Sequence, residues 1–245
     1  LDDPEKRESA LAALPQHGSD GLKLLASWWR SNRRDRVATE RAAETALAFA
    51  PSSERFFKDL IGNKVAEPVV ARAASLFKPT DRGNALLVLA VEKMKGDDAK
   101  AIALTTLSDR THPKAVPFAL KHMKRGNVVL RDASARVLGR SGDRTHIRVL
   151  VEQLQIEARA ASESNLQARM GVHWALSTLG GPDVVAPLIA ALDRKDDQDS
   201  LVAALVRVGF PAVSPLTLVL KSGDSRRIPG SVAALLEMGE LTAPY

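Results

Sequence analysis

Cysteine is absent from this chain of 245 residues, and aromatic side chains make up only 4% of it. Without cysteine the sequence offers no disulfide, no thiolate metal ligand and no cysteine nucleophile, although this does not fix a compartment. With so few rings the core must be built from Ala, Leu and Val, whose small alanines let helices approach one another closely. No apolar run approaches the roughly 20 residues that cross a bilayer, so we expect no membrane span.

The N-terminus carries no visible signal peptide and begins at Leu1 rather than Met. We therefore expect the sequence to be a processed product or an excised piece of a longer chain. The compartment stays open.

Catalytic and cofactor signatures are also missing. The five histidines are dispersed and form neither an H-x-x-x-H pair nor an H-E-x-x-H motif. No G-x-S-x-G elbow, Walker A loop or dinucleotide-binding glycine motif is present. The acidic run Asp196–Asp199 lacks the glycine and the final glutamate of a calcium loop, so we interpret it as a solvated connection. We predict no catalytic residue, no cofactor and no metal site, and hence no enzyme.

The net charge of +6 is concentrated in the middle of the chain. Residues 31–157 carry 23 basic and 15 acidic side chains, whereas residues 1–30 and 158–245 each carry one more acidic than basic side chain. A basic middle attracts an acidic protein, a nucleic acid or a membrane surface. This charge affects the encounter with a partner but does not identify that partner.

A short phrase, an aliphatic residue followed by glycine, closes four alanine-rich segments in the second half of the chain. Its copies end at Gly139, Gly180, Gly209 and Gly239, at intervals of 41, 29 and 30 residues. Such a period is typical of stacked helical repeats. We expect each glycine to take the left-handed position after a helix, with Asp143, Pro182 or Pro211 opening the next helix.

Apolar residues between these phrases have helical spacing. Ile147, Leu150, Val151 and Leu154 fall at i, i+3, i+4 and i+7. In the first half the period is looser, but proline-containing breaks separate segments of helical length. The expected pairs are Glu5–Leu14 with Asp20–Arg30, Arg36–Phe49 with Ser53–Ile61, Glu67–Phe77 with Asp81–Met94, and Asp97–Leu107 with Pro113–Lys124.

The segments Arg131–Asp143 and Ala175–Asp193 read RDASARVLGRSGD and ALSTLGGPDVVAPLIAALD. They resemble the HEAT-repeat superfamily, most closely the short bacterial HEAT-like repeat also found in phycobilin lyases. The resemblance implies an all-α, right-handed α-solenoid of about seven to eight antiparallel helix pairs, with second helices on the concave side. We predict one domain over residues 1–245, with divergent repeats in 1–126 and regular repeats in 127–245.

Two places depart from the period. The longest interval contains an insertion near residues 155–167, which is either a lengthened helix or passive loop, or a protruding element that shapes a binding surface. The last repeat is cut short after Met238-Gly239. Its apolar layer is then covered by further chain or by self-association through the truncated C-terminal repeat.

The main candidate for a binding surface is a basic strip on two successive second helices. Its residues are Lys114, Lys121, Lys124, Arg125, Arg144 and Arg148. Arg144 and Arg148 are four residues apart and are expected to share a helix face. The strip would bind an acidic peptide, a nucleic-acid backbone or anionic headgroups; the alternative is a set of ordinary solvated side chains.

A second basic cluster lies beside the adjacent residues Trp28 and Trp29 and consists of Arg30, Arg33, Arg34 and Arg36. Neighbours on a helix are about 100° apart, so the two rings cannot face the same core position. We expect one ring in the core and the other exposed or covered by an arginine stem. An exposed Trp29 with Arg33 and Arg34 would form an interface anchor. Trp174 is expected to be packed.

We predict a non-catalytic protein–protein interaction scaffold whose partner is a protein with an acidic surface. The alternative is a nucleic-acid-binding protein related to the HEAT-like alkylpurine DNA glycosylases. That family uses aromatic residues and a carboxylate in a groove that faces DNA, whereas the central second helices here offer Phe118 and no Trp or Tyr. Nothing marks a bilin site either.

Overall fold

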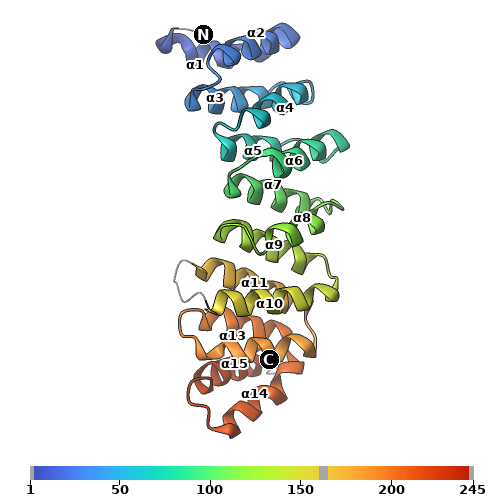
Figure 1. The fold of residues 1–245 in the computed structure, drawn as a ribbon, viewed down its shortest axis with the longest axis vertical. Coiled ribbons are helices and arrows are strands. Elements are labelled where there is room, and N and C mark those ends of the chain that lie inside the picture. The colour runs from blue at the N-terminus through green and yellow to red at the C-terminus, as the bar shows by residue number, and fades with distance from the viewer. Residues whose placement is uncertain (1–2, 160–164, 243–245) are drawn as a thin grey trace. The chain divides into compact units, whose positions relative to one another are not determined.

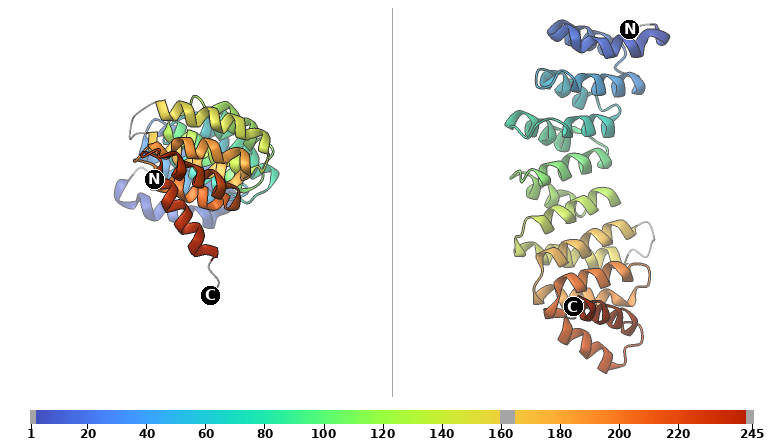
Figure 2. Two further views of the ribbon diagram at one scale, coloured as in Figure 1. Left: turned by 90° about the horizontal axis from the view of Figure 1, so that it is seen from below. Right: turned by 180° about the vertical axis from the view of Figure 1, so that it is seen from behind.

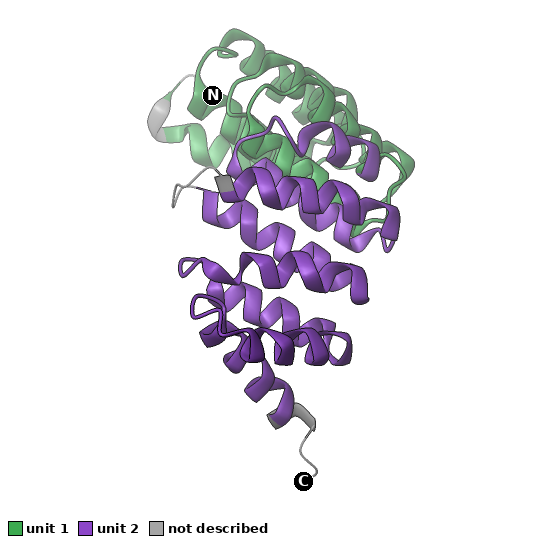
Figure 3. Cartoon of the chain, turned by 60° about the horizontal axis from the view of Figure 1, so that its bottom comes forward, with its two compact units in different colours: residues 1–115 green, residues 116–245 purple. Residues whose placement is uncertain are grey.

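The computed structural model describes residues 3–159 and 165–242, and within these ranges it contains helices and turns but no strand. The chain forms two compact units, Leu1–Ala115 and Val116–Tyr245 (Figure 3). The single domain expected over residues 1–245 stays a prediction.

Unit 1 is built from helices that pack in two layers (Figure 1). They are α1 (Pro4–Ala13), α2 (Gly18–Ser31), α3 (Arg36–Leu47), α4 (Glu54–Asn63), α5 (Glu67–Ser75), α6 (Asp81–Lys93) and α7 (Asp97–Asp109). Helix α5 packs between α3 and α7 in one layer, and α4 packs on α6 in the other. Alanines such as Ala42 and Ala74 are fully buried, and their small side chains allow this close stacking.

Unit 2 repeats the same arrangement (Figure 2). Its helices are α8 (Ala115–His122), α9 (Val128–Arg140), α10 (Ile147–Arg159), α11 (Leu166–Leu179), α12 (Val185–Ala190), α13 (Gln198–Val208), α14 (Phe210–Ser222) and α15 (Ile228–Thr242). In the first-helix layer α9, α11, α13 and α15 pack in succession, while α12 packs on α14 in the second layer. Consecutive stacking in two layers confirms the predicted all-α solenoid fold.

The recurring glycine phrase has two structural roles. Gly180 and Gly209 follow α11 and α13 with a positive φ of 63° and 74°, as expected, but their ψ of −168° and −139° lies outside the predicted left-handed helical region. Gly139 and Gly239 instead lie inside α9 and α15, where the prediction is wrong. A Cβ at Gly139 would lie 2.7 Å from the Cα of Ala175 on α11, so this glycine permits the close approach of two helices.

The predicted openings of the second helices are confirmed. The Asp143 carboxylate accepts hydrogen bonds from the backbone N and the hydroxyl of Thr145, at 2.9 and 2.7 Å. Pro182 begins the short 3-10 turn before α12, and Pro211 lies in the first turn of α14, where a missing N–H costs nothing.

Part of the predicted insertion is a lengthened helix, because α10 continues to Arg159. Residues 160–164 lie outside the described residues, and α11 begins at Leu166. A protruding element at this place stays a prediction.

Candidate functional site

The predicted basic strip is partly assembled around one carboxylate in unit 2. Lys124 Nζ lies 3.2 Å from Glu152 Oε2, and Arg148 Nε lies 3.4 Å from Glu152 Oε1. The hydrogen bond and positive charge of Lys124, with a smaller effect of Arg148, lower the pKa of Glu152 below its ordinary value. Glu152 is therefore an anion shared by two cations.

Two further predicted cations lie in the same stretch. Lys121 is in the last turn of α8 and Arg125 follows shortly after that helix, and both are exposed. Neither makes an ion pair with any residue that the structure describes. We call Lys121, Lys124, Arg125 and Arg148 the α8–α10 basic surface. Two of its cations, Lys124 and Arg148, share the carboxylate of Glu152, and the other two have no ion pair among the described residues.

Arg144 has a different role from the one predicted. It belongs to a 3-10 turn, Arg144–His146, and its Nη1 donates to the carbonyl oxygens of Leu179 and Gly180 at 3.0 and 2.7 Å. Its Nη2 lies 2.9 Å from Asp183 Oδ2. Arg144 therefore binds the C-terminal end of α11. The expected basic face shared by Arg144 and Arg148 is not formed.

Lys114 belongs to unit 1, and its Nζ lies 3.8 Å from Glu92 Oε1 on α6. It precedes α8, which begins at Ala115, so the predicted helix start at Pro113 is early by two residues. Lys114 is exposed, and its ion pair is of the ordinary surface kind.

The predicted tryptophan anchor is wrong, because both neighbouring indole rings are buried. Trp29 is 4% exposed, donates from Nε1 to Thr39 Oγ1 at 3.3 Å and meets the ring of Phe56 edge-on. Trp28 is 7% exposed and is covered by the guanidinium of Arg7, 5.8 Å from its ring centroid. The two rings enter different parts of the core.

Arg33 and Arg34 remain exposed in the turn after α2, beside a shallow depression of about 440 Å³. Because Trp29 is buried, these two arginines form a charged turn without an aromatic anchor.

A group that the sequence analysis missed lies in the first-helix layer of unit 2. The guanidinium Cζ atoms of Arg136 and Arg140 on α9 lie 5.5 and 5.9 Å from the ring centroid of Trp174 on α11. Arg207 on α13 places its Cζ 5.8 Å from the same ring. Trp174 is half-buried rather than fully packed. We call these four residues the Arg–Trp cluster.

A signal for this cluster is present in the repeat register. Trp174 stands six residues before Gly180, and Arg207 stands two before Gly209. Arg136 and Arg140 stand three before and one after Gly139. On aligned helices these offsets are i, i+4, i+3 and i+7, which is one face. Comparing neighbouring repeats position by position would have found the cluster.

A second polar group in unit 2 is closed to ligands. Arg169 and Asp197 are joined at 2.7 Å between Nε and Oδ2, and both side chains have no exposed surface. His173 lies beside them, with Nδ1 2.7 Å from Ser200 Oγ. Burial, with the charges of Arg169 and Arg194, lowers the pKa of His173 to about 3. This network joins α11 to the start of α13 inside the repeat stack.

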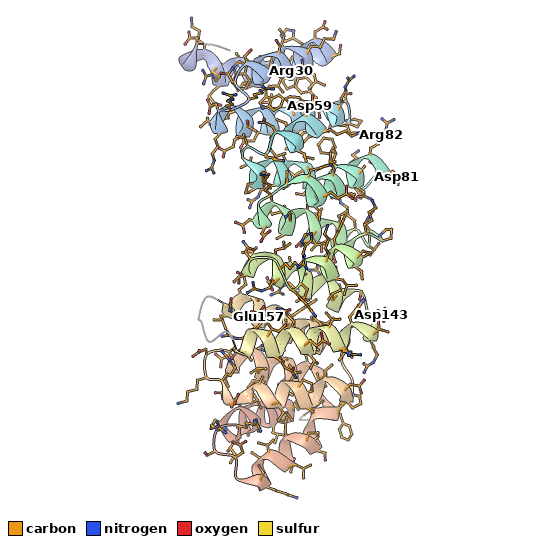
Figure 4. All side chains as sticks on the ribbon, viewed as in Figure 1. Arg30, Asp59, Asp81, Arg82, Asp143 and Glu157 are labelled. Carbon is orange, nitrogen blue, oxygen red and sulfur yellow. The ribbon has the colours of Figure 1, made fainter. Side chains whose placement is uncertain are left out.

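Arg131 and Glu157 form a comparable internal pair at 2.7 Å, and Glu157 is 2% exposed (Figure 4). The Nε2 of Gln153 also donates to Glu157, at 2.6 Å. Removing one partner would leave a buried charge uncompensated, so these pairs fix how α9 and α10 are joined.

A hollow of about 670 Å³ lies between α2 and α4 in unit 1. Its lining includes Phe49 and Phe56, with Arg30 and Asp59 at its margin (Figure 4). In unit 2 an apolar hollow of about 480 Å³ is lined by Val206 and Leu235 beside Phe210, which is 89% exposed. Self-association through this last repeat stays a prediction.

None of the helices in residues 3–159 and 165–242 has the length and apolar character that a membrane span requires. The same residues contain no group of three His, Asp or Glu side chains placed to hold a metal ion.

A family model for the PBS lyase HEAT-like repeat matches residues 169–194. The matched segment contains nearly all of α11, the turn at Pro182 and the whole of α12, which is one helix pair. A search of curated proteins gave no match. The match falls on the segment Ala175–Asp193 that carried the resemblance, so over this one helix pair of unit 2 the chain is similar to the PBS lyase HEAT-like repeat.

Proposed function

We propose that this protein is a non-catalytic interaction scaffold that binds an acidic partner protein on the α8–α10 basic surface. One observation carries the proposal: of the four exposed cations of this surface, only Lys124 and Arg148 have an ion-pair partner among the described residues, and that partner is the one carboxylate of Glu152. An excess of positive charge on an exposed face accelerates the encounter with an acidic surface and favours it over a basic one.

The ion pairs of this surface suit exchange with a partner. The side chains of Lys124 and Arg148 are 53% and 89% exposed, and that of Glu152 is 43% exposed. Exposed pairs contribute only about 0–1 kcal/mol, so either cation can leave Glu152 for a partner carboxylate at little cost. HEAT-like repeats present such side chains on rigid helices, which keeps their spacing fixed.

The test is the binding of a fluorescently labelled oligoglutamate peptide to the 245-residue chain, followed by anisotropy. We expect the double substitution Lys121→Glu/Arg125→Glu to abolish binding, because it replaces two unpaired cations by anions. The matched control is Arg33→Glu/Arg34→Glu, which makes the same charge change on the turn after α2. That control should bind like the unmodified protein.

The outcomes separate the candidates. Loss of binding only in the Arg33/Arg34 variant would move the site to that turn, and equal binding by all three proteins would contradict the proposal. Duplex DNA is the comparison ligand. Tighter binding of DNA than of peptide, with a loss of about 10² between about 50 and 200 mM salt as expected for about four phosphate contacts, would favour the nucleic-acid alternative.

A further inference from the structure

The Arg–Trp cluster concentrates positive charge around one half-buried indole ring. The guanidinium carbons of Arg136, Arg140 and Arg207 each lie within 5.9 Å of the Trp174 ring centroid. The aromatic face compensates a cation only in part. The cluster is on α9, α11 and α13, separate from the α8–α10 basic surface, and it does not depend on the function proposed above.

The two arginines that line the pocket beside Trp174, Arg136 and Arg207, differ in how far a carboxylate compensates them. Asp132 Oδ1 lies 2.8 Å from Arg136 Nε, and that carboxylate also accepts from Gln167. Arg207 is exposed, and in the described ranges no carboxylate lies within ion-pair distance of it. A guanidinium that stacks on a ring keeps its N–H edge available for a planar or tetrahedral anion. The cluster therefore favours an anion with more than one charge.

A small pocket adjoins the ring. It has a volume of about 210 Å³ and is walled mainly by Trp174, Met170, Ala203 and Ala204, with Arg136 and Arg207 among its lining residues. Two alanines on α13, in place of larger residues, leave this space open. A cavity of about 150 Å³ is enough for benzene, so the pocket has room for one aryl ring next to the indole.

We propose that the Arg–Trp cluster binds an aryl phosphate group, in the form of a phosphorylated tyrosine side chain presented by a partner protein. The ring enters the pocket beside Trp174, and the phosphate lies between Arg136 and Arg207, which both line that pocket. A phosphate monoester carries a charge of about −1.5 to −2 at pH 7 and three acceptor oxygens, so more than one guanidinium can bind it at once. A carboxylate has one charge and two oxygens.

The experiment uses phenyl phosphate as the probe and the full chain as the protein. The Trp174 indole N–H resonance, assigned with Trp174→Phe, is followed by NMR during titration. Phenyl sulfate is the matched control ligand, since it has nearly the same shape and one charge less. We expect phenyl phosphate to bind about tenfold or more tightly than phenyl sulfate, and to lose this advantage near pH 5, where phosphate is a monoanion.

Two variants locate the site. Arg207→Gln should weaken phenyl phosphate by about tenfold, whereas Arg226→Gln, an exposed arginine outside the cluster, should leave the affinity unchanged. Lys121→Glu/Arg125→Glu should also leave it unchanged, which separates this inference from the proposed function. Inorganic phosphate should bind more weakly, because it does not fill the pocket.

The proposal is overturned if phenyl phosphate leaves the Trp174 resonance unmoved or binds no better than phenyl sulfate. It is also overturned if Arg207→Gln binds phenyl phosphate as well as the unmodified protein does. An oligothymidylate that shifts Trp174 when phenyl phosphate does not would assign the cluster to single-stranded nucleic acid instead.

Discussion

At the scale of single residues, the structure separates side chains that hold the repeats together from those that face outward. Leu138 and Leu188 are fully buried between helices, whereas Leu236 is 65% exposed and Lys124 is at the surface. Leucine is thus a core residue at some helix positions and a surface residue at others.

We expect Leu138→Ala and Leu188→Ala each to lower the free energy of unfolding by roughly 2–5 kcal/mol, because each leaves a cavity between packed helices. Leu236→Ala and Lys124→Ala should stay within about 0.5 kcal/mol. Urea unfolding followed by circular dichroism measures all four. Similar losses in buried and exposed variants would show that the assignment of the core is wrong.

His173 makes stability depend on pH. Its folded-state pKa is lowered to about 3 from an ordinary 6.5, so between these values the unfolded chain binds a proton that the folded protein does not. The free energy of unfolding therefore falls as pH falls through this window, by up to about 1.4 kcal/mol per pH unit.

We expect this slope to be reduced in His173→Gln, which has no titrating ring. Urea unfolding at about pH 7.5 and about pH 5.5, for both proteins, gives the difference in slope directly. An imidazole resonance of His173 that titrates near its ordinary pKa in the folded protein would contradict the burial of this residue.

At the scale of elements, the same two-residue phrase ends some helices and lies inside others. Gly180 and Gly209 have a positive φ that favours glycine, whereas Gly139 lies in a helix where a side chain would meet the neighbouring helix. The role of Gly139 depends on Ala175, which lies on the neighbouring helix α11. The two-residue phrase alone therefore could not predict which role each glycine has.

Gly139→Ala is expected to destabilise the protein by about 1–3 kcal/mol, because its Cβ would lie 2.7 Å from the Cα of Ala175 and the helices must separate. Gly239→Ala is the matched control, since a Cβ there meets nothing within 4 Å. It should be neutral or stabilising by up to about 1 kcal/mol, through helix propensity. Thermal unfolding compares the two, and a stabilised Gly139→Ala would contradict the close helix contact.

Most helix boundaries could be predicted, because apolar spacing and the breaks at proline and glycine are local properties of the chain. The roles of Arg144, Trp29 and the Arg–Trp cluster could not, since each depends on a residue about 10 to 40 positions away that the fold brings close. The role of Arg144 depends on its hydrogen bond to the carbonyl of Leu179, and the burial of Trp29 depends on its contacts with Thr39 and Phe56. Local patterns locate elements, whereas contacts between repeats decide which side chains are free.

At the scale of the whole molecule, the chain offers rigid stacked helices with charge that is not internally balanced. The buried pairs Arg169–Asp197 and Arg131–Glu157 are closed within the repeats, so they fix the frame. The proposed function assigns the exposed cations of the α8–α10 basic surface to a partner. This division between internal and outward charge is what we expect of a binding scaffold.

Glu152→Gln tests this account most directly, because it removes the carboxylate that pairs with Lys124 and Arg148 in the α8–α10 basic surface. The proposed scaffold should then bind the oligoglutamate peptide more tightly, by about two- to tenfold in anisotropy titrations at low salt. Glu92→Gln is the matched control: its side chain is also 43% exposed and paired with a lysine, Lys114, but it lies in unit 1. Tighter binding by Glu152→Gln alone is the predicted result; unchanged or weaker binding, or an equal gain in Glu92→Gln, would contradict the account.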